Sequence, residues 1–160
     1  MDVKLLLEDD PFIFLGILPT FDLDLEILEK RYLELSKLYH PDKNLKETRL
    51  ATLYTAKLNT SYKTLLDPYS RAHCLLDSFF WLDSAPISND FLEKILNYTE
   101  LLNADTSRDQ ALSEIQAQIQ TSWEQIKRAF QIYFQTKDSK ELNIIARELV
   151  LLKYWNRLLS

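Results

Sequence analysis

Hydrophobic residues recur every three or four positions through most of the chain, which is the spacing of one face of an α-helix. The first long example lies within residues 21–40, after Asp22 and Asp24, either of which can cap its first turn. Pro41 ends it, because a residue before proline is driven out of the helical region of backbone space. The predicted apolar face of this helix is Leu25, Leu28, Tyr32, Leu35 and Tyr39.

A second helix is predicted over residues 49–66, after a polar loop of about eight residues. Pro68 breaks or redirects the chain, and residues 69–82 predict a further helix. Residues 10–20 are apolar but interrupted by proline and glycine, so they predict a short helical turn or an extended piece. The two long helices are expected to form an antiparallel pair. The face of the second is Leu50, Tyr54, Leu58, Ser61, Tyr62 and Leu65.

Three more amphipathic helices are predicted beyond a linker-like stretch at residues 83–90. The first is capped by Ser88, Asn89 or Asp90 and runs to about residue 103, and the second follows Thr106 or Ser107. Asp138 and Glu141 resemble a capping box for the third. Short joints between long helices are typical of a helix bundle. The faces of the last two are Leu112, Ile115, Ile119, Trp123, Ile126, Phe130 and Tyr133, and then Leu142, Ile145, Leu149, Leu152 and Trp155.

These patterns predict an all-α protein with two parts. Residues 1–82 form a helical domain, 83–90 a linker, and 91–160 a three-helix bundle. The composition agrees, because the 160 residues include one glycine and five prolines, too few for the many turns of a sheet protein. No run of about 18 apolar residues appears, so no membrane span is expected.

The formal net charge is −5, and acidic residues outnumber basic ones in both halves. That argues against nucleic-acid binding, which needs a clustered positive surface. The lone cysteine cannot form an internal disulfide, hold a zinc ion alone or carry an iron–sulfur cluster. The acidic N-terminus is unlike a signal or transit peptide, so we expect a bacterial cytoplasmic protein, with the mitochondrial matrix as an alternative.

The tripeptide His40-Pro41-Asp42 joins the first two long helices. It can be a plain helix stop, with histidine against the negative helix end and aspartate capping a turn. It also places an imidazole, a fixed turn and a carboxylate together. Those groups suit recognition, because a carboxylate accepts strong hydrogen bonds from a partner's arginine or lysine.

In its context this motif resembles the signature of the J domain, the module of DnaJ-type co-chaperones. The run from Tyr39 to Asn44 lies between two amphipathic helices, as in that family. The resemblance implies that the loop docks on a DnaK-class chaperone and stimulates its ATPase, and that the protein is not itself an enzyme. The implied chaperone-binding residues are Tyr32, His40, Pro41, Asp42, Lys43 and Asn44.

The continuation through Leu58-Asn59, Asp67-Pro68 and Arg71-Ala72 resembles the HscB family, the J proteins of iron–sulfur cluster assembly. That resemblance implies a partner chaperone of the HscA type and a C-terminal bundle that holds the iron–sulfur scaffold protein (IscU-like). The helix before the motif is also less basic than in generic DnaJ proteins, in keeping with a specialised partner. No cofactor is implied.

The bundle has apolar residues beyond one band per helix, for example Leu92 and Leu96 beside the stripe that contains Tyr98. They can be buried against other parts of the chain or form an exposed patch, which usually marks a partner site. The HscB resemblance implies scaffold binding by Leu92, Leu96 and Glu100, with Leu151 opposite, although Glu93 and Asn97 depart from the family pattern.

Two other functions fit parts of the sequence. One is a J protein with a different client. The other is a small metal-binding enzyme that uses His40 and Asp42, but metal sites need three or four ligands and His-Pro-Asp supplies two. A metal assay and a chaperone ATPase assay would separate these functions.

Overall fold

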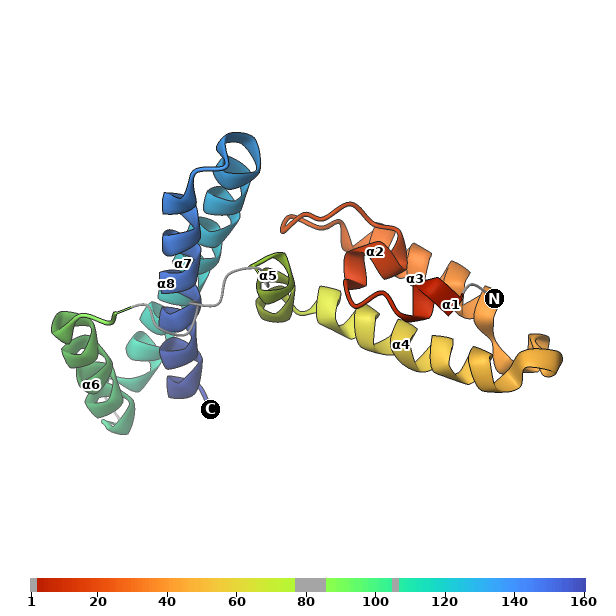
Figure 1. Cartoon of the computed structure of the whole chain (residues 1–160). Helices are drawn as coiled ribbons and strands as arrows, with labels where there is room; N and C mark the ends of the chain where they lie inside the picture. Colours follow the sequence, from red (N-terminus) through yellow and green to blue (C-terminus); the bar gives the residue numbers. More distant parts are fainter. Residues whose placement is uncertain (1–2, 77–85, 105–106) are drawn as a thin grey trace. The chain divides into compact units, whose positions relative to one another are not determined.

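The computed structural model describes residues 3–76, 86–104 and 107–160 of the chain (Figure 1). The regular structure in these ranges is helical, and no strand occurs in them, which confirms the predicted all-α class. The chain divides into two compact units, residues 1–78 and 79–160.

The first unit is built on an antiparallel pair of helices, α3 (Leu25–Tyr39) and α4 (Thr48–Leu66). Two ring stacks show the direction of the pair, because Tyr32 lies on Tyr62 and Tyr39 lies on Tyr54, with centroids 4.4 and 4.3 Å apart. The short helix α2 (Pro11–Leu15) packs against both (Figure 1), and α5 (Pro68–Leu76) follows α4.

The core of this unit forms where α2, α3 and α4 meet. Each fully buried large apolar side chain contributes about 1.5–3 kcal/mol to folding, so this cluster supplies most of the driving force for the helix pair. Of the two predicted cap candidates for α3, Asp24 is the cap, accepting from the amides of Glu26 and Ile27. The buried cluster is Phe12, Phe14, Leu15, Leu28, Leu35, Tyr54, Leu58 and Leu65.

Leu25 does not belong to the core, which corrects the predicted apolar face of α3. Its side chain is 49% exposed. Helical side chains tilt toward the N-terminus of their helix, so a residue in the first position leans beyond the end of the pair and finds little to pack on. On α4 the small Ala51, rather than Leu50, is fully buried.

The sequence pattern did not predict α1 (Val3–Leu6). Leu5 and Leu6 pack against the core of the first unit. The ammonium group of Lys57 on α4 donates to the Leu6 carbonyl at 2.8 Å and lies over the Phe14 ring. A helix of one turn is too short to be stable alone, so tertiary contacts rather than periodicity account for it.

Gly16 ends α2 in the left-handed region, with φ +66°. A Cβ at this position would lie 3.1 Å from the guanidinium of Arg31. Arg31 also donates from Nε to the Leu15 carbonyl at 2.8 Å, so one α3 side chain closes the exposed end of α2. The only glycine of the chain is therefore used where both the backbone and the space favour it.

The second unit is a three-helix bundle, as predicted, of α6 (Asn89–Asn103), α7 (Arg108–Thr136) and α8 (Ser139–Leu158). Trp155 lies at the centre of the part of the bundle that α6 covers. The rings of Phe91 and Tyr98 contact its ring edge-on, with ring centroids 5.3 and 5.6 Å apart, respectively. The predicted face of α8 is buried throughout. Its residues are Leu142, Ile145, Leu149, Leu152 and Trp155.

Small residues occupy much of the buried face of α7. Ala111, Ser122 and Ala129 are buried, whereas the predicted Trp123 is only half-buried. Helices that pack closely favour small side chains at the nearest approach, and apolar counting misses these positions. Ser122 donates to the buried carboxylate of Glu148 on α8 at 2.9 Å, a polar contact that the sequence did not predict.

The helix caps and helix boundaries agree in part with those predicted from the sequence. Ser88 caps α6 through the Phe91 amide, and Asp138 caps α8 through the Lys140 amide. In a full capping box the Asp138 amide would also donate to the Glu141 side chain. Here that amide donates to the Thr136 hydroxyl instead. The helix predicted over residues 69–82 is described as far as Leu76. Its remainder, linker residues 83–85 and the candidate cap Thr106 lie outside the described residues.

Candidate functional site

The His-Pro-Asp tripeptide forms the corner between α3 and α4. His40 has φ −58° and ψ 130°, the extended conformation that a following proline imposes. Pro41 then begins the 3-10 turn η1 (Pro41–Lys43), followed by η2 (Leu45–Glu47) and α4. The predicted polar loop is therefore a pair of tight turns rather than an open segment.

The imidazole of His40 is fixed by its own loop. Its Nδ1 accepts a hydrogen bond from the backbone N–H of Asp42 at 3.1 Å. A neutral ring that accepts at Nδ1 carries its proton at Nε2, which leaves Nε2–H as a donor for a partner. The Asp42 carboxylate lies 3.8 Å from Nδ1 and its side chain is 89% exposed, so it keeps most of its capacity to accept hydrogen bonds.

Asn44 ties the loop back to the end of α3. Its side-chain amide donates to the carbonyls of Leu38 and His40, both at 3.0 Å. The backbone amides of Lys43 and Asn44 donate to His40 and Pro41, respectively. These bonds satisfy carbonyls that a helix end leaves unpaired, and they hold the tripeptide in one shape.

Two aromatic contacts fix the end of α3 on α4 beneath the loop. Tyr39 stacks on Tyr54 with only 11° between the ring planes. One to two turns earlier, Tyr32 stacks on Tyr62, and its hydroxyl donates to Asn59 at 2.9 Å. Tyr32, expected to contact the chaperone, is thus half-buried and bonded within the unit, and its role in binding stays a prediction.

The second expected site lies on α6. Leu92, Leu96 and Glu100 follow one another at intervals of four, so they share one face of the helix. Leu92 is 39% exposed and Leu96 is 64% exposed. The other face, with Phe91, Ile95, Tyr98 and Leu102, packs on the bundle core. Leu151 on α8 is half-buried against the same core.

Polar contacts orient α6 on α7. The Tyr98 hydroxyl donates to Glu114 at 2.9 Å, and Gln110 donates to the other oxygen of the same carboxylate. Hydrogen bonds from Gln110 and Tyr98 lower the pKa of Glu114, while burial and then Glu114 raise the pKa of Tyr98. Lys94 donates to Gln118 and lies over the Trp155 ring.

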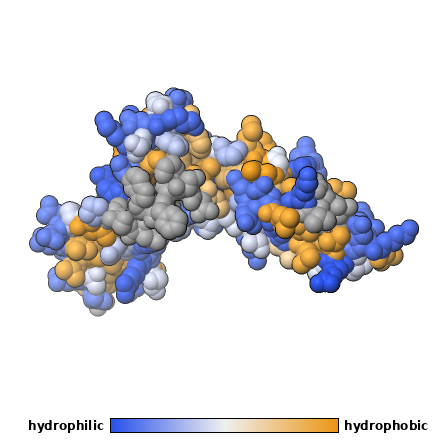
Figure 2. All heavy atoms as spheres, in the orientation of Figure 1, coloured by the Kyte–Doolittle hydropathy of each residue, from blue (hydrophilic) through white to orange (hydrophobic). Residues whose placement is uncertain are grey.

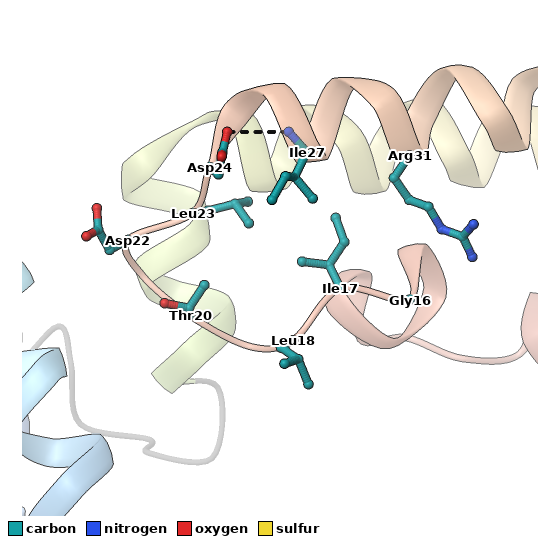
Figure 3. A pocket seen from close by; sticks show the side chains of 9 residues that line it. All are labelled: Gly16, Ile17, Leu18, Thr20, Asp22, Leu23, Asp24, Ile27 and Arg31. Atoms are coloured by element: carbon teal, nitrogen blue, oxygen red, sulfur yellow. Dashed lines mark hydrogen bonds between the residues drawn. The ribbon is translucent and has the colours of Figure 1, made fainter.

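A hollow of about 380 Å³ lies between the segment after α2 and the first turns of α3 (Figure 3). Ile17, Leu23 and Ile27 contribute apolar lining. Its charged residues already have partners within the unit, because Asp24 caps α3 and Arg31 binds the Leu15 carbonyl and Glu34. The hollow offers a partner mainly apolar surface.

Within the described ranges, no group of three or more His, Cys, Asp and Glu side chains is arranged to hold a metal ion. In the same ranges, no helix is long and apolar enough to cross a membrane.

Known proteins resemble both units. A family model described as the DnaJ domain matches residues 10–74, and one described as the HSCB C-terminal oligomerisation domain matches residues 88–160. The co-chaperone protein HscB homolog of Shewanella halifaxensis is 32% identical over 129 residues, which cover 73% of this chain and 71% of that protein. The chain belongs to the HscB family of co-chaperones.

Other HscB proteins agree with this assignment. The match to the HscB homolog of Shewanella loihica is 41% identical but spans only 69 residues, 41% of this chain and 40% of that relative. The human HscB crystal structure superposes with a TM-score of 0.75 at 23% identity, covering 92% of this chain and 77% of that one. It shows the same fold. The predicted J domain and HscB-type C-terminal domain are confirmed.

Proposed function

We propose that this protein stimulates ATP hydrolysis by a DnaK/HscA-type chaperone and delivers an iron–sulfur scaffold protein to it. The observation that carries the proposal is that hydrogen bonds within the loop hold the His-Pro-Asp tripeptide in one shape, on the DnaJ domain of an HscB-family chain. Iron–sulfur cluster assembly and transfer would then be served indirectly, without a cluster or cofactor on this chain. The proposed location is a bacterial cytoplasm, which the bacterial origin of the two Shewanella relatives supports.

The chaperone contact is proposed to run through His40, Pro41, Asp42, Lys43 and Asn44, with Tyr32 beside them on α3. The internal hydrogen bonds of the loop mean that little conformational freedom is lost on docking, which lowers the cost of association. The exposed carboxylate of Asp42 suits a partner arginine or lysine. The groups bind and position the partner, and ATP hydrolysis takes place on the chaperone.

The scaffold contact is proposed to use the exposed face of α6, with Leu92, Leu96 and Glu100, and Leu151 on α8. Two leucines one turn apart, with a carboxylate one turn further, give an apolar anchor with a charged end. Because Phe91 and Tyr98 hold the opposite face of α6 on the core, the leucines are presented by a fixed helix.

The chaperone contact is tested by a steady-state ATPase assay with the chaperone of the same organism. His40→Gln removes the imidazole geometry and is expected to reduce stimulation to near the basal rate. The matched control is His73→Gln, at the other histidine of the chain on α5, which should stimulate like the wild type. Full stimulation by folded His40→Gln would refute the proposed role of the loop.

The scaffold contact is tested by calorimetric titration with the organism's own iron–sulfur scaffold protein. Leu92→Ala/Leu96→Ala should weaken binding at least about tenfold, roughly 1.4 kcal/mol. Circular dichroism checks that the variant is folded, and Leu18→Ala in the first unit serves as an exposed-leucine control. If the wild-type protein itself does not bind the scaffold, the protein is a J protein with a different client.

A further inference from the structure

Two exposed leucines flank the His-Pro-Asp corner. Leu38 lies in the last turn of α3 and is 60% exposed, and Leu45 begins η2 and is 78% exposed. Leu45 is the single apolar residue between Asp42 and Thr48. Single exposed leucines are ordinary on protein surfaces, so their position relative to the loop is what gives these two significance.

The hydrogen bonds of Asn44 bring the two positions to the same end of the helix pair. The Asn44 amide donates to the carbonyl of Leu38 at 3.0 Å, and Leu45 is the next residue along the chain. The hydrogen bonds that hold His40 and Asp42 in place therefore also fix the backbone positions of Leu38 and Leu45. An open depression of about 440 Å³ is lined by residues 43–47, so Leu45 stands beside a concave surface.

Three lysines and one glutamate lie near this apolar pair in the sequence, and Lys43, Lys46 and Glu47 line the depression together with Leu45. Lys37, Lys43 and Lys46 are all exposed and are close sequence neighbours of Leu38 or Leu45. Apolar anchors with a charged rim are the usual anatomy of a specific protein interface. The complementary surface would be an apolar depression edged by acidic side chains.

We propose that Leu38 and Leu45 are specificity-determining contacts to the ATPase chaperone, and that they enter an acidic-rimmed apolar depression next to the site for the His-Pro-Asp corner. This inference rests on the proposed function. It assigns a division of labour, in which the polar corner triggers ATP hydrolysis and the leucines set the affinity for one chaperone. Apolar anchors suit a helix pair whose α3 carries few basic residues, because affinity then depends less on electrostatic attraction.

The test is ATPase stimulation as a function of co-chaperone concentration, with the HscA-type chaperone of the same organism. Leu38→Gln/Leu45→Gln keeps side-chain length and helix propensity but removes the apolar contact. We expect its half-maximal concentration to rise about tenfold with maximal stimulation retained. Leu38→Met/Leu45→Met keeps an apolar side chain of similar volume and should stay near the wild type.

The matched control is Leu18→Gln/Leu66→Gln, two exposed leucines outside the loop, one before α3 and one at the end of α4. It should leave the concentration dependence unchanged. If wild type stimulates the chaperone and the Leu38/Leu45 glutamine variant matches this control, the inference is overturned while the proposed function stands. If wild type does not stimulate at all, the proposed function fails and the inference fails with it.

Discussion

Asn44 determines the shape of the loop at the scale of single residues. Its side-chain amide makes two hydrogen bonds to carbonyls at the end of α3, whereas the His40 ring accepts from the backbone of its own turn. His40 and Asp42 are held through the backbone that Asn44 fixes. We therefore expect the orientation of His40 and Asp42 to depend on Asn44, which is itself part of the proposed chaperone contact.

Replacement of Asn44 tests this dependence. Asn44→Ala removes both hydrogen bonds and should lower the free energy of unfolding by about 1 kcal/mol, because solvent replaces part of each exposed bond. Asn44→Asp is nearly isosteric, but its carboxylate cannot donate and would face two carbonyl oxygens, so it should be at least as harmful. Urea denaturation measures stability, and the chaperone ATPase assay measures function.

Asn97→Ala on α6 is the matched control, because it removes an exposed asparagine from the other unit. It should change the free energy of unfolding by no more than a few tenths of a kcal/mol. It should leave ATPase stimulation unchanged. Wild-type stimulation by Asn44→Asp would contradict the role given to the amide donors.

The sequence predicted single residues well where local chemistry decides. Pro41 as a helix stop, and the small sets of cap candidates that include Asp24 and Ser88, follow from backbone rules that need no tertiary knowledge. The sequence did not predict residues whose burial depends on tertiary packing. The exposure of Leu25 depends on where the helix pair ends, and the burial of Glu148 depends on Ser122 lying opposite on α7.

Among the helices, α6 depends strongly on its neighbours. A helix of 15 residues is marginal in isolation. It is held by the aromatic contacts of Phe91 and Tyr98 with Trp155 and by the hydrogen bond from Tyr98 to Glu114. The proposed scaffold-binding leucines share this helix, so α6 must be docked on the bundle to present them.

Tyr98→Phe tests the polar half of this docking and predicts a pH dependence. Hydrogen bonds lower the pKa of Glu114 in the folded protein below its ordinary value of 4.5. Its stabilising contribution is therefore present above pH 4.5 and is lost as the pH falls through the lowered folded pKa. The variant should have a lower melting temperature than wild type at neutral pH, and the difference should shrink below pH 4.5.

Calorimetric melting of both proteins between neutral and acidic pH measures this difference. The matched control is Tyr154→Phe on α8, which removes a tyrosine hydroxyl elsewhere in the unit and keeps the ring that meets Phe91 edge-on. Its effect should not vary over the acidic range. A Tyr98→Phe effect that is constant across the pH range would show that Glu114 does not contribute through this bond.

Helix periodicity predicted the long elements because each buries one continuous face. It recovered α3, α4, α6, α7 and α8. It missed α1, whose single turn is held by Lys57 and the core, and it undervalued Ala111 and Ser122, whose small size allows α7 to approach its neighbours closely.

At the scale of the whole molecule, the proposed chaperone contact and the proposed scaffold contact lie on separate compact units. Figure 2 shows hydrophobic side chains among hydrophilic ones on the visible surface of each described unit. The exposed apolar residues proposed to bind partners are Leu38 and Leu45 in the first unit and Leu92 and Leu96 in the second. We therefore expect core mutations in one unit to damage one contact and spare the other.

Leu58→Ala and Trp155→Ala test this separation. Both side chains are buried, and their truncation should cost about 2–5 and 3–5 kcal/mol, respectively, through lost burial and cavity formation. Leu58→Ala should reduce ATPase stimulation while calorimetric affinity for the scaffold stays close to the wild type. Trp155→Ala should do the reverse. Loss of both activities in either variant would contradict independent units.

The J domain could be predicted from sequence because the His-Pro-Asp motif, its place in a loop and the two amphipathic helices on either side together resemble the signature of that family. The partners could not be fixed in the same way. Affinity depends on surfaces of the partner that this sequence does not encode, and the roles of Tyr32 and Leu151 depend on how each is packed.

The most direct test of the account is whether this protein couples the scaffold to the chaperone. The measurement is chaperone ATPase rate against scaffold concentration, with and without this protein. The account predicts that wild type lowers the scaffold concentration needed for half-maximal stimulation, and that His40→Gln and Leu92→Ala/Leu96→Ala each abolish that shift. A scaffold dependence unchanged by the wild-type protein would contradict the central claim.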